Sequence, residues 1–555
     1  MLHPSHFLFG AAALAIVLRG NVRRIAVTAA PALALWTLFG LSGGSSLPYK
    51  LPGYTLELMR FDSLSLLFGI IFCLITFAGI IYALHHPGGK EQAASLALAG
   101  SALGVVFAGD WITMFVFWEL MSVASIFIIW MGDTPGSLKA GYRYLLVHVM
   151  GGGILFAGIL LHLANGGSSE FLALTGQGPL TPAGWLILTG VAVNSAIPPL
   201  HAWLTDAYPE CTVTGSVVQS AFTTKTAVYV LLRAFPGAEP LAVIGVIMAL
   251  YGVVFAVLEN DIRRLLSYHI VSQVGFMVAG VGLGTALSLD GAAAHAFCHI
   301  LYKGLLFMGA GAIIYATGKS KLTELGGLVR QMPAVLVLFM VGAFSISGLP
   351  MFNGFISKTM TISAFGHEHR IVLELLLELA SVGTFLSIGL KLAYHAFFGE
   401  DCKIKAKALP ANMYVAMGFA AALCTLLGLF PQMLYDFLPN AAEYHPYTLT
   451  HVAGSLQLHL GTAAAFWLLL KVLKPKDAIS LDVDWLYRKP FAALVGGIVA
   501  LLRGIGRVMS TEGVALCVNA VPFDYEVDRR RAPVGLALFW IALFFSFAAY
   551  YAARH

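Results

Sequence analysis

The chain has 555 residues, of which 59% are hydrophobic and only 11% are charged. A soluble globular protein carries about 25% charged residues, so this composition excludes a soluble multidomain protein and indicates a polytopic membrane protein. The net charge of +5 does not indicate nucleic-acid binding, because the basic residues fall in short loops between apolar segments. The six cysteines show no C-x-x-C spacing, which predicts neither a disulfide framework nor a metal or iron–sulfur site.

A transmembrane helix needs about 20 mainly apolar residues, and the sequence contains about 16 such segments. An all-α polytopic membrane fold is therefore expected. The segments are residues 5–18, 23–42, 62–84, 91–109, 111–131, 140–165, 182–206, 213–233, 239–258, 263–284, 289–316, 332–366, 371–398, 411–431, 449–473 and 535–553. The first segment is short and lacks a preceding basic region, so it reads as a membrane helix and not as a cleavable signal.

Lysine and arginine residues in short loops predict the orientation of a membrane protein. Most of them follow odd-numbered segments, as Arg24, Lys139 and Arg264 do. This places the odd loops in the cytoplasm and the N-terminus outside, in what we expect to be a bacterial inner membrane.

Two segments contain a break at membrane depth. The seventh contains Pro198 and Pro199, and the twelfth contains Gly348 and Pro350. Proline removes a helix hydrogen bond, and such breaks are tolerated where they are buried in protein or line a cavity. Broken helices five segments apart predict two related five-helix units of inverted topology, as in many ion carriers. Two ordinary proline kinks are the alternative.

This repeat gives a predicted division of the whole chain. Residues 1–90 hold helices 1–3, residues 91–235 the first five-helix repeat, residues 236–400 the second repeat, residues 401–473 helices 14 and 15, residues 474–534 a basic cytoplasmic segment, and residues 535–555 a last helix. Between Asp484 and Arg507, apolar and basic residues alternate at helical spacing. This pattern predicts an amphipathic helix on the membrane or along a neighbouring subunit, with a short soluble tail as the alternative.

Charged side chains interrupt several of the apolar segments. Glu119 lies midway along the fifth, and the eighth, eleventh, twelfth and thirteenth carry Lys225, Lys303, Lys358 and Lys391. A charge at membrane depth costs roughly 3 kcal/mol, so it persists where it is paired, lines a wet path or carries an ion. The series predicts a proton or cation pathway. The structural alternatives are a neutral Glu119, a Lys225 fixed in an ion pair, and a Lys391 that snorkels to the cytoplasmic surface.

His295, His299 and Lys303 stand at i, i+4 and i+8, which places them on one helix face. The histidines have the spacing of a metal pair, but no further ligand accompanies them. Because histidine titrates near neutral pH, a hydrated proton relay is the favoured interpretation, and core-packed histidines are the alternative. We expect this chain to bind neither a metal nor a cofactor.

Charges also occur near the segment ends. Glu374 and Glu378 mark an exit vestibule or solvate a helix end, and Asp261, Arg263 and Arg264 mark an entrance or an interfacial anchor.

Several stretches together resemble a known family. They are FVFWELMS, PPLHAWLTDAYPE, TTKTAVY, NDIRRLLSYHIVSQVGF, HAFCHILYKGLLF and SGLPMFNGFISK, in order over residues 105–400. They resemble the antiporter-like membrane subunits of respiratory complex I (chains L, M and N) and of Mrp-type cation/proton antiporters. The region after Lys391 and the overall length are most similar to the D-type subunits of Mrp antiporters, whereas the tail SLDVDWLYRKP resembles chain L. The resemblance implies about 14 core helices in two inverted five-helix repeats around a hydrophilic axis parallel to the membrane.

The resemblance also assigns roles by position. Glu119 matches the fifth-helix glutamate and Lys225 the eighth-helix lysine of the family. His295, His299 and Lys303 match its connecting histidines and lysine, and Lys358 matches the lysine after the second break.

One position departs from the family pattern. Asn194 stands where the family has a lysine that pairs with the fifth-helix glutamate. Glu119 therefore lacks its expected partner, unless another cation such as Lys225 replaces it. Otherwise the first half-channel is altered or inactive.

Two functions of different class follow from these features. The first is a proton- and cation-translocating subunit of a multisubunit cation/proton antiporter or redox-driven pump, with other membrane subunits as partners and protons, and Na⁺ or K⁺, as the moving ions. The second is a membrane scaffold that energises a soluble partner, such as an inorganic-carbon uptake protein. A stand-alone carrier of an organic solute is disfavoured, because the charges form a linear series and not one central pocket.

Overall fold

The computed structural model describes residues 3–41, 43–51, 54–176, 178–478, 481–491, 493–494, 496–498 and 500–501. Contacts divide them into a large unit, residues 3–48 and 57–478, and a small unit, residues 49–56 and those described from 481 onward. The predicted helix at 535–553 lies outside the described residues, as does the amphipathic segment beyond residue 501. The described part of that segment is helical, with α20 (Asp484–Leu486) followed by the π-helical η5 (Tyr487–Phe491).

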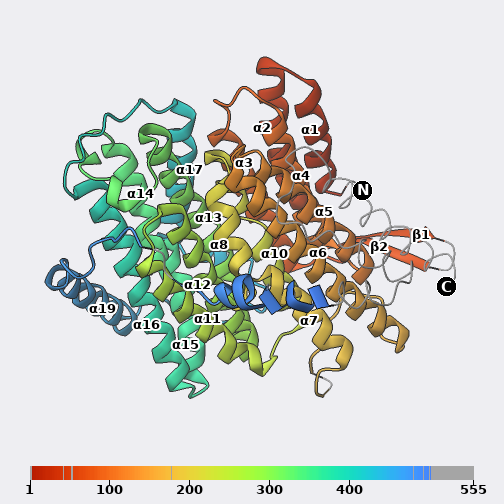
Figure 1. Ribbon diagram of the computed structural model, residues 1–555. Helices are drawn as coiled ribbons and strands as arrows, with labels where there is room; N and C mark the ends of the chain where they lie inside the picture. The colour runs from red at the N-terminus through yellow and green to blue at the C-terminus, as the bar shows by residue number, and fades with distance from the viewer. Residues whose placement is uncertain are drawn as a thin grey trace. The chain divides into compact units, whose positions relative to one another are not determined.

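The large unit is mostly helical (Figure 1). Its first half contains α1 (Ser5–Val17), α2 (Gly20–Phe39), α3 (Ser63–Tyr82), α4 (Lys90–Phe107), α5 (Trp111–Trp130), α6 (Pro135–Ala164), α7 (Pro182–Asn194), α8 (Ala202–Glu210), α9 (Val213–Gln219) and α10 (Thr223–Ala234). Its second half contains α11 (Glu239–Leu258), α12 (Ile262–Leu283), α13 (Ala286–Thr317), the 3-10 turns η1 (Leu322–Glu324) and η2 (Leu328–Arg330), α14 (Pro333–Ser347), α15 (Asn353–His367), α16 (Ile371–Thr384), the π-helical η3 (Phe385–Leu392) and η4 (Tyr394–Phe398), α17 (Ala411–Leu429), α18 (Gln432–Tyr435) and α19 (Leu449–Leu468).

The helices confirm the predicted membrane fold. Among the described residues, 9 helices are long and apolar enough to cross a bilayer, and shorter apolar helices accompany them. The predicted count of about 16 spans stays a prediction. Two segments expected as continuous α-helices differ: the eighth divides into α9 and α10, and the thirteenth changes from α16 into η3 and η4.

A two-stranded sheet was not expected from the sequence. It consists of β1 (Ser46–Leu51) and β2 (Tyr54–Arg60). In the stretch YTLELMR, polar and apolar residues alternate at the period of a strand. This signal is too short to register in a search for membrane helices.

Both predicted helix breaks are present. The first separates α7 from α8 at Pro198 and Pro199, and the second separates α14 from α15 at Gly348 and Pro350. Gly348 ends α14 with φ 79°, a left-handed conformation that glycine adopts without steric cost. Each break leaves backbone carbonyls without a helical partner inside the protein.

The centre of the large unit is formed by α12 and α13, in which 100% and 94% of the most apolar 18-residue stretch is buried. Close helix packing depends on glycine there. A Cβ added at Gly275 of α12 would lie 2.5 Å from the Ala249 nitrogen of α11, and one at Gly245 would lie 2.2 Å from the Ala279 nitrogen. Small residues allow membrane helices to approach this closely. α13 in turn contacts α9, α10, α14, α15 and α17, as its central place in Figure 1 shows.

Candidate functional site

The membrane lysines are deeply buried. Lys225 and Lys303 are 0% exposed, Lys358 is 2% exposed, and Lys391 is 3% exposed. An isolated buried charge is costly, so the contacts of each amine decide whether it can persist.

Most of these amines donate to backbone carbonyls at helix ends. Lys225 Nζ lies 2.6 Å from the Ser220 oxygen, between α9 and α10. Lys358 Nζ lies 2.7 Å from the Ile346 oxygen, beside the second break. A carbonyl is a neutral acceptor that holds a lysine in both its protonated and its neutral form. The lysine can therefore gain or lose a proton without breaking an ion pair.

Lys391 makes the same kind of contact at the end of α11. Its amine lies 2.6 Å from the Val257 oxygen and 2.8 Å from the Glu259 oxygen. The side chain is directed to this helix end and not to solvent, which differs from the snorkelling alternative. The π-helical winding of η3 surrounds Lys391, and such segments are frequent at functional sites.

Lys303 differs from the other lysines because α13 is unbroken around it. Its Nζ has no hydrogen-bond partner among the described residues, and it lies 5.8 Å from the Phe307 ring centroid. Both ring nitrogens of His299, one turn away, likewise have no partner there. Buried polar atoms in proteins are nearly always paired, commonly with internal water. This face of α13 therefore presents buried polar atoms that the described residues leave without partners.

His295 links the α13 face to the second break. Its Nδ1 lies 3.0 Å from the Ser357 hydroxyl, and Ser357 directly precedes Lys358 on α15. Its Nε2 lies 3.4 Å from the Tyr302 hydroxyl, which also lies 3.3 Å from the Gln273 side-chain oxygen. The structure thus connects His295 with the neighbourhood of Lys358.

Sequence reasoning missed a polar seam between α12 and the α16–η3 helix. His269 Nε2 lies 2.6 Å from the Ser387 hydroxyl, and the Gln273 amide lies 3.4 Å from the Thr384 hydroxyl. All four side chains are fully buried. The i, i+4 spacing of His269 and Gln273 in an otherwise apolar helix is the signal that could have identified them.

The first half is arranged differently. Glu119 on α5 is half-buried, and its Oε1 has no hydrogen-bond partner among the described residues. Asn194, at the end of α7, is 0% exposed, and neither atom of its amide has a partner there. The Lys225 amine donates to the Ser220 carbonyl, and among the described residues no hydrogen bond or ion pair joins Lys225 to Glu119.

Buried hydroxyl groups accompany this first half. The hydroxyls of Tyr144 and Tyr208 both lie beside the Thr223 hydroxyl. The Tyr144 ring stacks on His148 with centroids 3.8 Å apart. Tyr144 and His148 stand at i and i+4 in YRYLLVH, a spacing that sequence reasoning overlooked.

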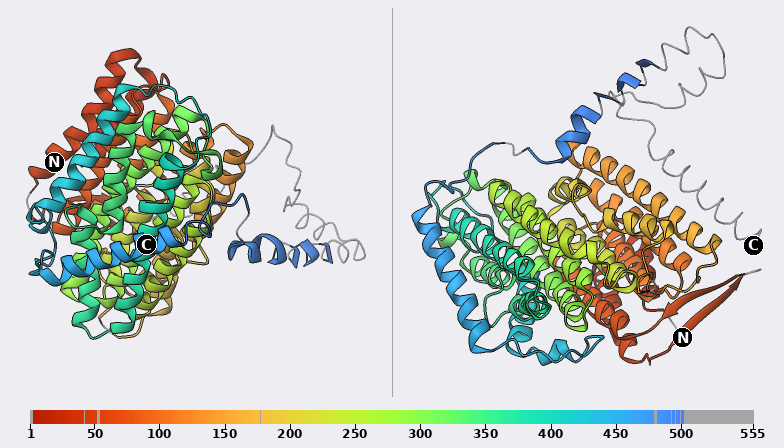
Figure 2. Two further views of the ribbon diagram at one scale, coloured as in Figure 1. Left: turned by 90° about the vertical axis from the view of Figure 1, so that its left-hand side faces the viewer. Right: turned by 90° about the horizontal axis from the view of Figure 1, so that it is seen from below.

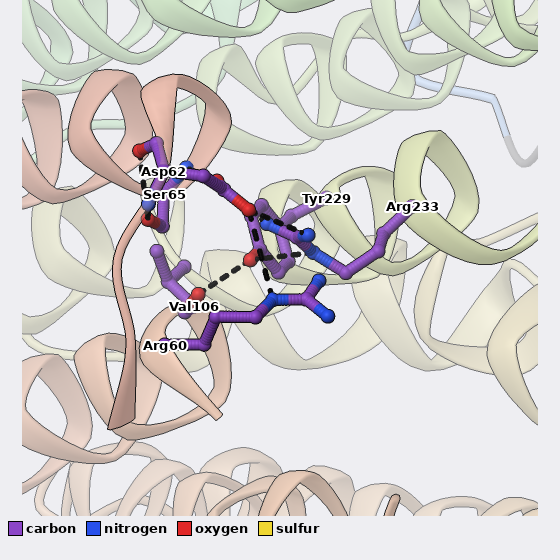
Figure 3. Close-up of polar contacts among 6 residues, drawn as sticks. All are labelled: Arg60, Asp62, Ser65, Val106, Tyr229 and Arg233. Atoms are coloured by element: carbon purple, nitrogen blue, oxygen red, sulfur yellow. Dashed lines mark hydrogen bonds and ion pairs between the residues drawn. The ribbon is translucent and has the colours of Figure 1, made fainter. Parts of the chain in front are cut away.

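A fully paired cluster lies at the other end of α10 (Figure 3). Arg233 makes two hydrogen bonds to Asp62, at 2.8 and 2.9 Å, and a third to the Tyr229 hydroxyl at 2.8 Å. The Tyr229 hydroxyl donates to the Val106 carbonyl, and Arg60 lies 3.7 Å from Asp62. Burial raises the pKa of Asp62, which precedes α3, but the hydrogen bonds and charge of Arg233 outweigh this effect, and the pKa lies below its ordinary value. We call these residues the Asp62–Arg233 clamp.

The charges at the start of α12 have structural contacts. Asp261 accepts hydrogen bonds from the backbone nitrogens of Arg263 and Arg264, both at 2.9 Å, and so caps the helix. Arg263 also donates to the Cys211 carbonyl. In the described part of the chain, no group of three or more His, Cys, Asp or Glu side chains is placed to hold a metal ion.

Comparison with known proteins identifies the family. The family described as NADH:quinone oxidoreductase/Mrp antiporter, TM, matches residues 108–387, which include α13, the whole of α15 and the beginning of η3. The chain belongs to this family.

Relatives and solved structures agree with this membership. The D-type subunit of the Na(+)/H(+) antiporter of Alkalihalophilus pseudofirmus is 30% identical over 61% of this chain and 72% of its own length. The A-type subunit from the same organism is 31% identical, but only 54% of its length is matched. Subunits in the Mrp complex from Dietzia sp. and in an archaeal membrane-bound sulfane sulfur reductase share the fold, each with a TM-score of 0.72 and 22% identity. The matches cover 82% and 99% of this chain, and 99% of each of those chains.

Proposed function

We propose that this membrane subunit translocates protons within a multisubunit cation/proton antiporter or a related redox-driven pump. The proposed pathway consists of Glu119, Lys225, His295, His299, Lys303, Lys358 and Lys391. Protons would enter from the cytoplasm, pass Lys225 and the α13 face, reach Lys358, and leave toward the outside. Each step is a change of protonation, and no covalent chemistry is required.

The observation that carries the proposal is the contact of buried lysines with neutral carbonyls. A lysine in a buried ion pair is held in its charged form, because the partner carboxylate would otherwise be buried alone. Lys225, Lys358 and Lys391 are instead held by the oxygens of Ser220, Ile346, Val257 and Glu259. Their charge is therefore free to follow that of neighbouring lysines.

The relatives support the setting of this activity. Those named above are subunits of Na(+)/H(+) antiporters, and the similar structures come from multisubunit membrane complexes. We therefore propose that this chain assembles with other membrane subunits into one complex. The complex would lie in a bacterial inner membrane, with the N-terminus of this chain outside.

The test uses the intact complex in inverted membrane vesicles that carry Lys225→Ala or Lys358→Ala. We expect proton translocation coupled to Na⁺, K⁺ or electron transfer to fall roughly tenfold or more, while the complex still assembles. Lys139→Ala is the matched control, since Lys139 is exposed near the start of α6. Wild-type rates in both buried-lysine variants would overturn the mechanism and favour the scaffold alternative.

A further inference from the structure

Helix α19 places an unexpected row of polar side chains against the second helix break. His451, Ser455 and His459 stand at i, i+4 and i+8, so they share one helix face. This face is half-buried, whereas Leu456, Leu460 and Leu468 elsewhere on α19 are exposed. α19 packs beside α16 and η3, as Figure 2 also shows.

Ser455 and His459 are the residues of this row that lie against the second helix break. The Ser455 hydroxyl donates to the carbonyl of Gly348, the residue that ends α14, at 3.1 Å. The His459 ring packs edge-on against Phe385 of η3, with centroids 4.7 Å apart. The Ser347 carbonyl, to which the Ser381 hydroxyl donates, faces the His459 ring, and the charge of Lys358 acts on the ring at longer range. His459 therefore lies at the rim of the Lys358 site.

The contacts of the ring determine which nitrogen can accept a proton. His459 Nδ1 lies 2.6 Å from the Ser455 carbonyl oxygen. A carbonyl only accepts hydrogen bonds, so Nδ1 carries the hydrogen in the neutral ring. Nε2 is then the basic atom, and once protonated it can donate to the neighbouring Ser347 carbonyl.

The proton donor on the other side of this site is the Lys358 ammonium. Its ammonium lies 3.2 Å from the Ser381 hydroxyl, which in turn donates to the Ser347 carbonyl at 3.2 Å. Toward the other end of α19, His451 Nε2 lies 3.4 Å from the Ser363 hydroxyl, and that hydroxyl lies 3.2 Å from the Tyr444 hydroxyl. Polar groups thus continue from Lys358 along α19 to its N-terminal end.

We propose that His459 receives the proton that Lys358 releases, and that His459, Ser455 and His451 form the exit path along α19. The Ser381 hydroxyl relays the proton: an N–H bond at Lys358 Nζ breaks as Ser381 Oγ takes that proton, the hydroxyl gives up its own hydrogen, and a new N–H bond forms at His459 Nε2. The lysine becomes a neutral amine and the ring an imidazolium. The imidazolium then passes a proton to water at the N-terminal end of α19. This inference rests on the proposed function.

The test compares His459→Ala, His459→Gln and Gln457→Ala in the intact complex in inverted vesicles. Gln457 is the matched control, since it is exposed on another face of α19. We expect both His459 variants to lose roughly tenfold or more of the proton flux, and the control to lose none. Added imidazole should restore flux in His459→Ala, because it supplies the missing proton carrier. A purely structural histidine would not give this rescue.

The outcomes separate the two proposals. If Lys358→Ala also transports at the wild-type rate, the proposed function itself has failed. If Lys358→Ala is inactive but His459→Gln retains full flux, the α19 exit path is overturned, because glutamine keeps the polarity but does not take up a proton near neutral pH. Should His459→Ala fail to assemble, His459→Gln decides the question alone.

Discussion

At both helix breaks the backbone leaves the helical conformation inside the protein, but different side chains lie beside the two breaks. At the first break, α7 ends in the neutral Asn194, whose amide atoms have no partner among the described residues. At the second, Lys358 donates to the Ile346 carbonyl and to Ser381. Both breaks expose carbonyls at membrane depth, but the second places a titratable cation on them. Under the proposed function, a break can hold a mobile proton only where a titratable side chain stands beside it, as Lys358 does at the second break.

We expect the largest difference in proton flux between the variants Lys358→Met and Glu119→Gln. Lys358→Met removes the lysine at the second break, and we expect proton flux to fall roughly tenfold or more. Glu119→Gln changes a site that already lacks its cation, so its loss should be clearly smaller. Flux in inverted vesicles measures both variants. Equal losses would show that the first half works as fully as the second.

A second prediction concerns the geometry of the second break. A Cβ at Gly354 would lie 1.7 Å from the Ser345 carbonyl oxygen, whereas one at Gly153 on α6 meets nothing within 4 Å. Gly354→Ala should therefore force α14 and α15 apart and destabilise the fold by about 1–3 kcal/mol. The melting temperature of the purified complex should fall for Gly354→Ala and stay unchanged for Gly153→Ala. An unchanged value for both would mean that the break tolerates rearrangement.

The third prediction compares the two basic residues of α10. Lys225 is held by a carbonyl, but Arg233 is held by a carboxylate in the Asp62–Arg233 clamp. Arg233→Ala leaves Asp62 without its main partner, and we expect a loss of about 2 kcal/mol in stability. Arg370→Ala, which breaks an exposed pair with Glu239, should cost under about 1 kcal/mol. Thermal melting measures both, and equal shifts would contradict the structural role of the clamp.

We expect the smallest change in proton flux from the variant Asn194→Lys. The substitution adds a cation at the first break, so Glu119 should become more important. Glu119→Gln should then reduce proton flux more in the Asn194→Lys background than in the wild type. A double-mutant cycle measures this coupling, and strictly additive effects would show that the two positions do not interact.

The sequence predicted the features that depend on local pattern. Apolar segments predicted membrane helices, since each helix satisfies its backbone within its own stretch of chain. Pro198, Pro199, Gly348 and Pro350 marked the breaks, because proline and glycine act on the backbone where they stand. The spacing of His295, His299 and Lys303 fixed their common face.

The two strands and the polar seam between α12 and the α16–η3 helix were harder to predict from the sequence. β1 and β2 were missed because they are short, and His269 was missed because one histidine in an apolar helix resembles many core residues. The division of the eighth segment at residues 220–222 had no proline or glycine to mark it.

By itself, then, the sequence determined that this is a membrane protein with broken helices and a series of buried charges. Only the tertiary structure decided the partners of those charges. Lys391 meets carbonyls more than 130 residues away, Arg233 meets Asp62 across 171 residues, and α19 returns to the second break. Contacts of this kind depend on how helix faces pack against one another, and the pattern within one helix does not contain that information.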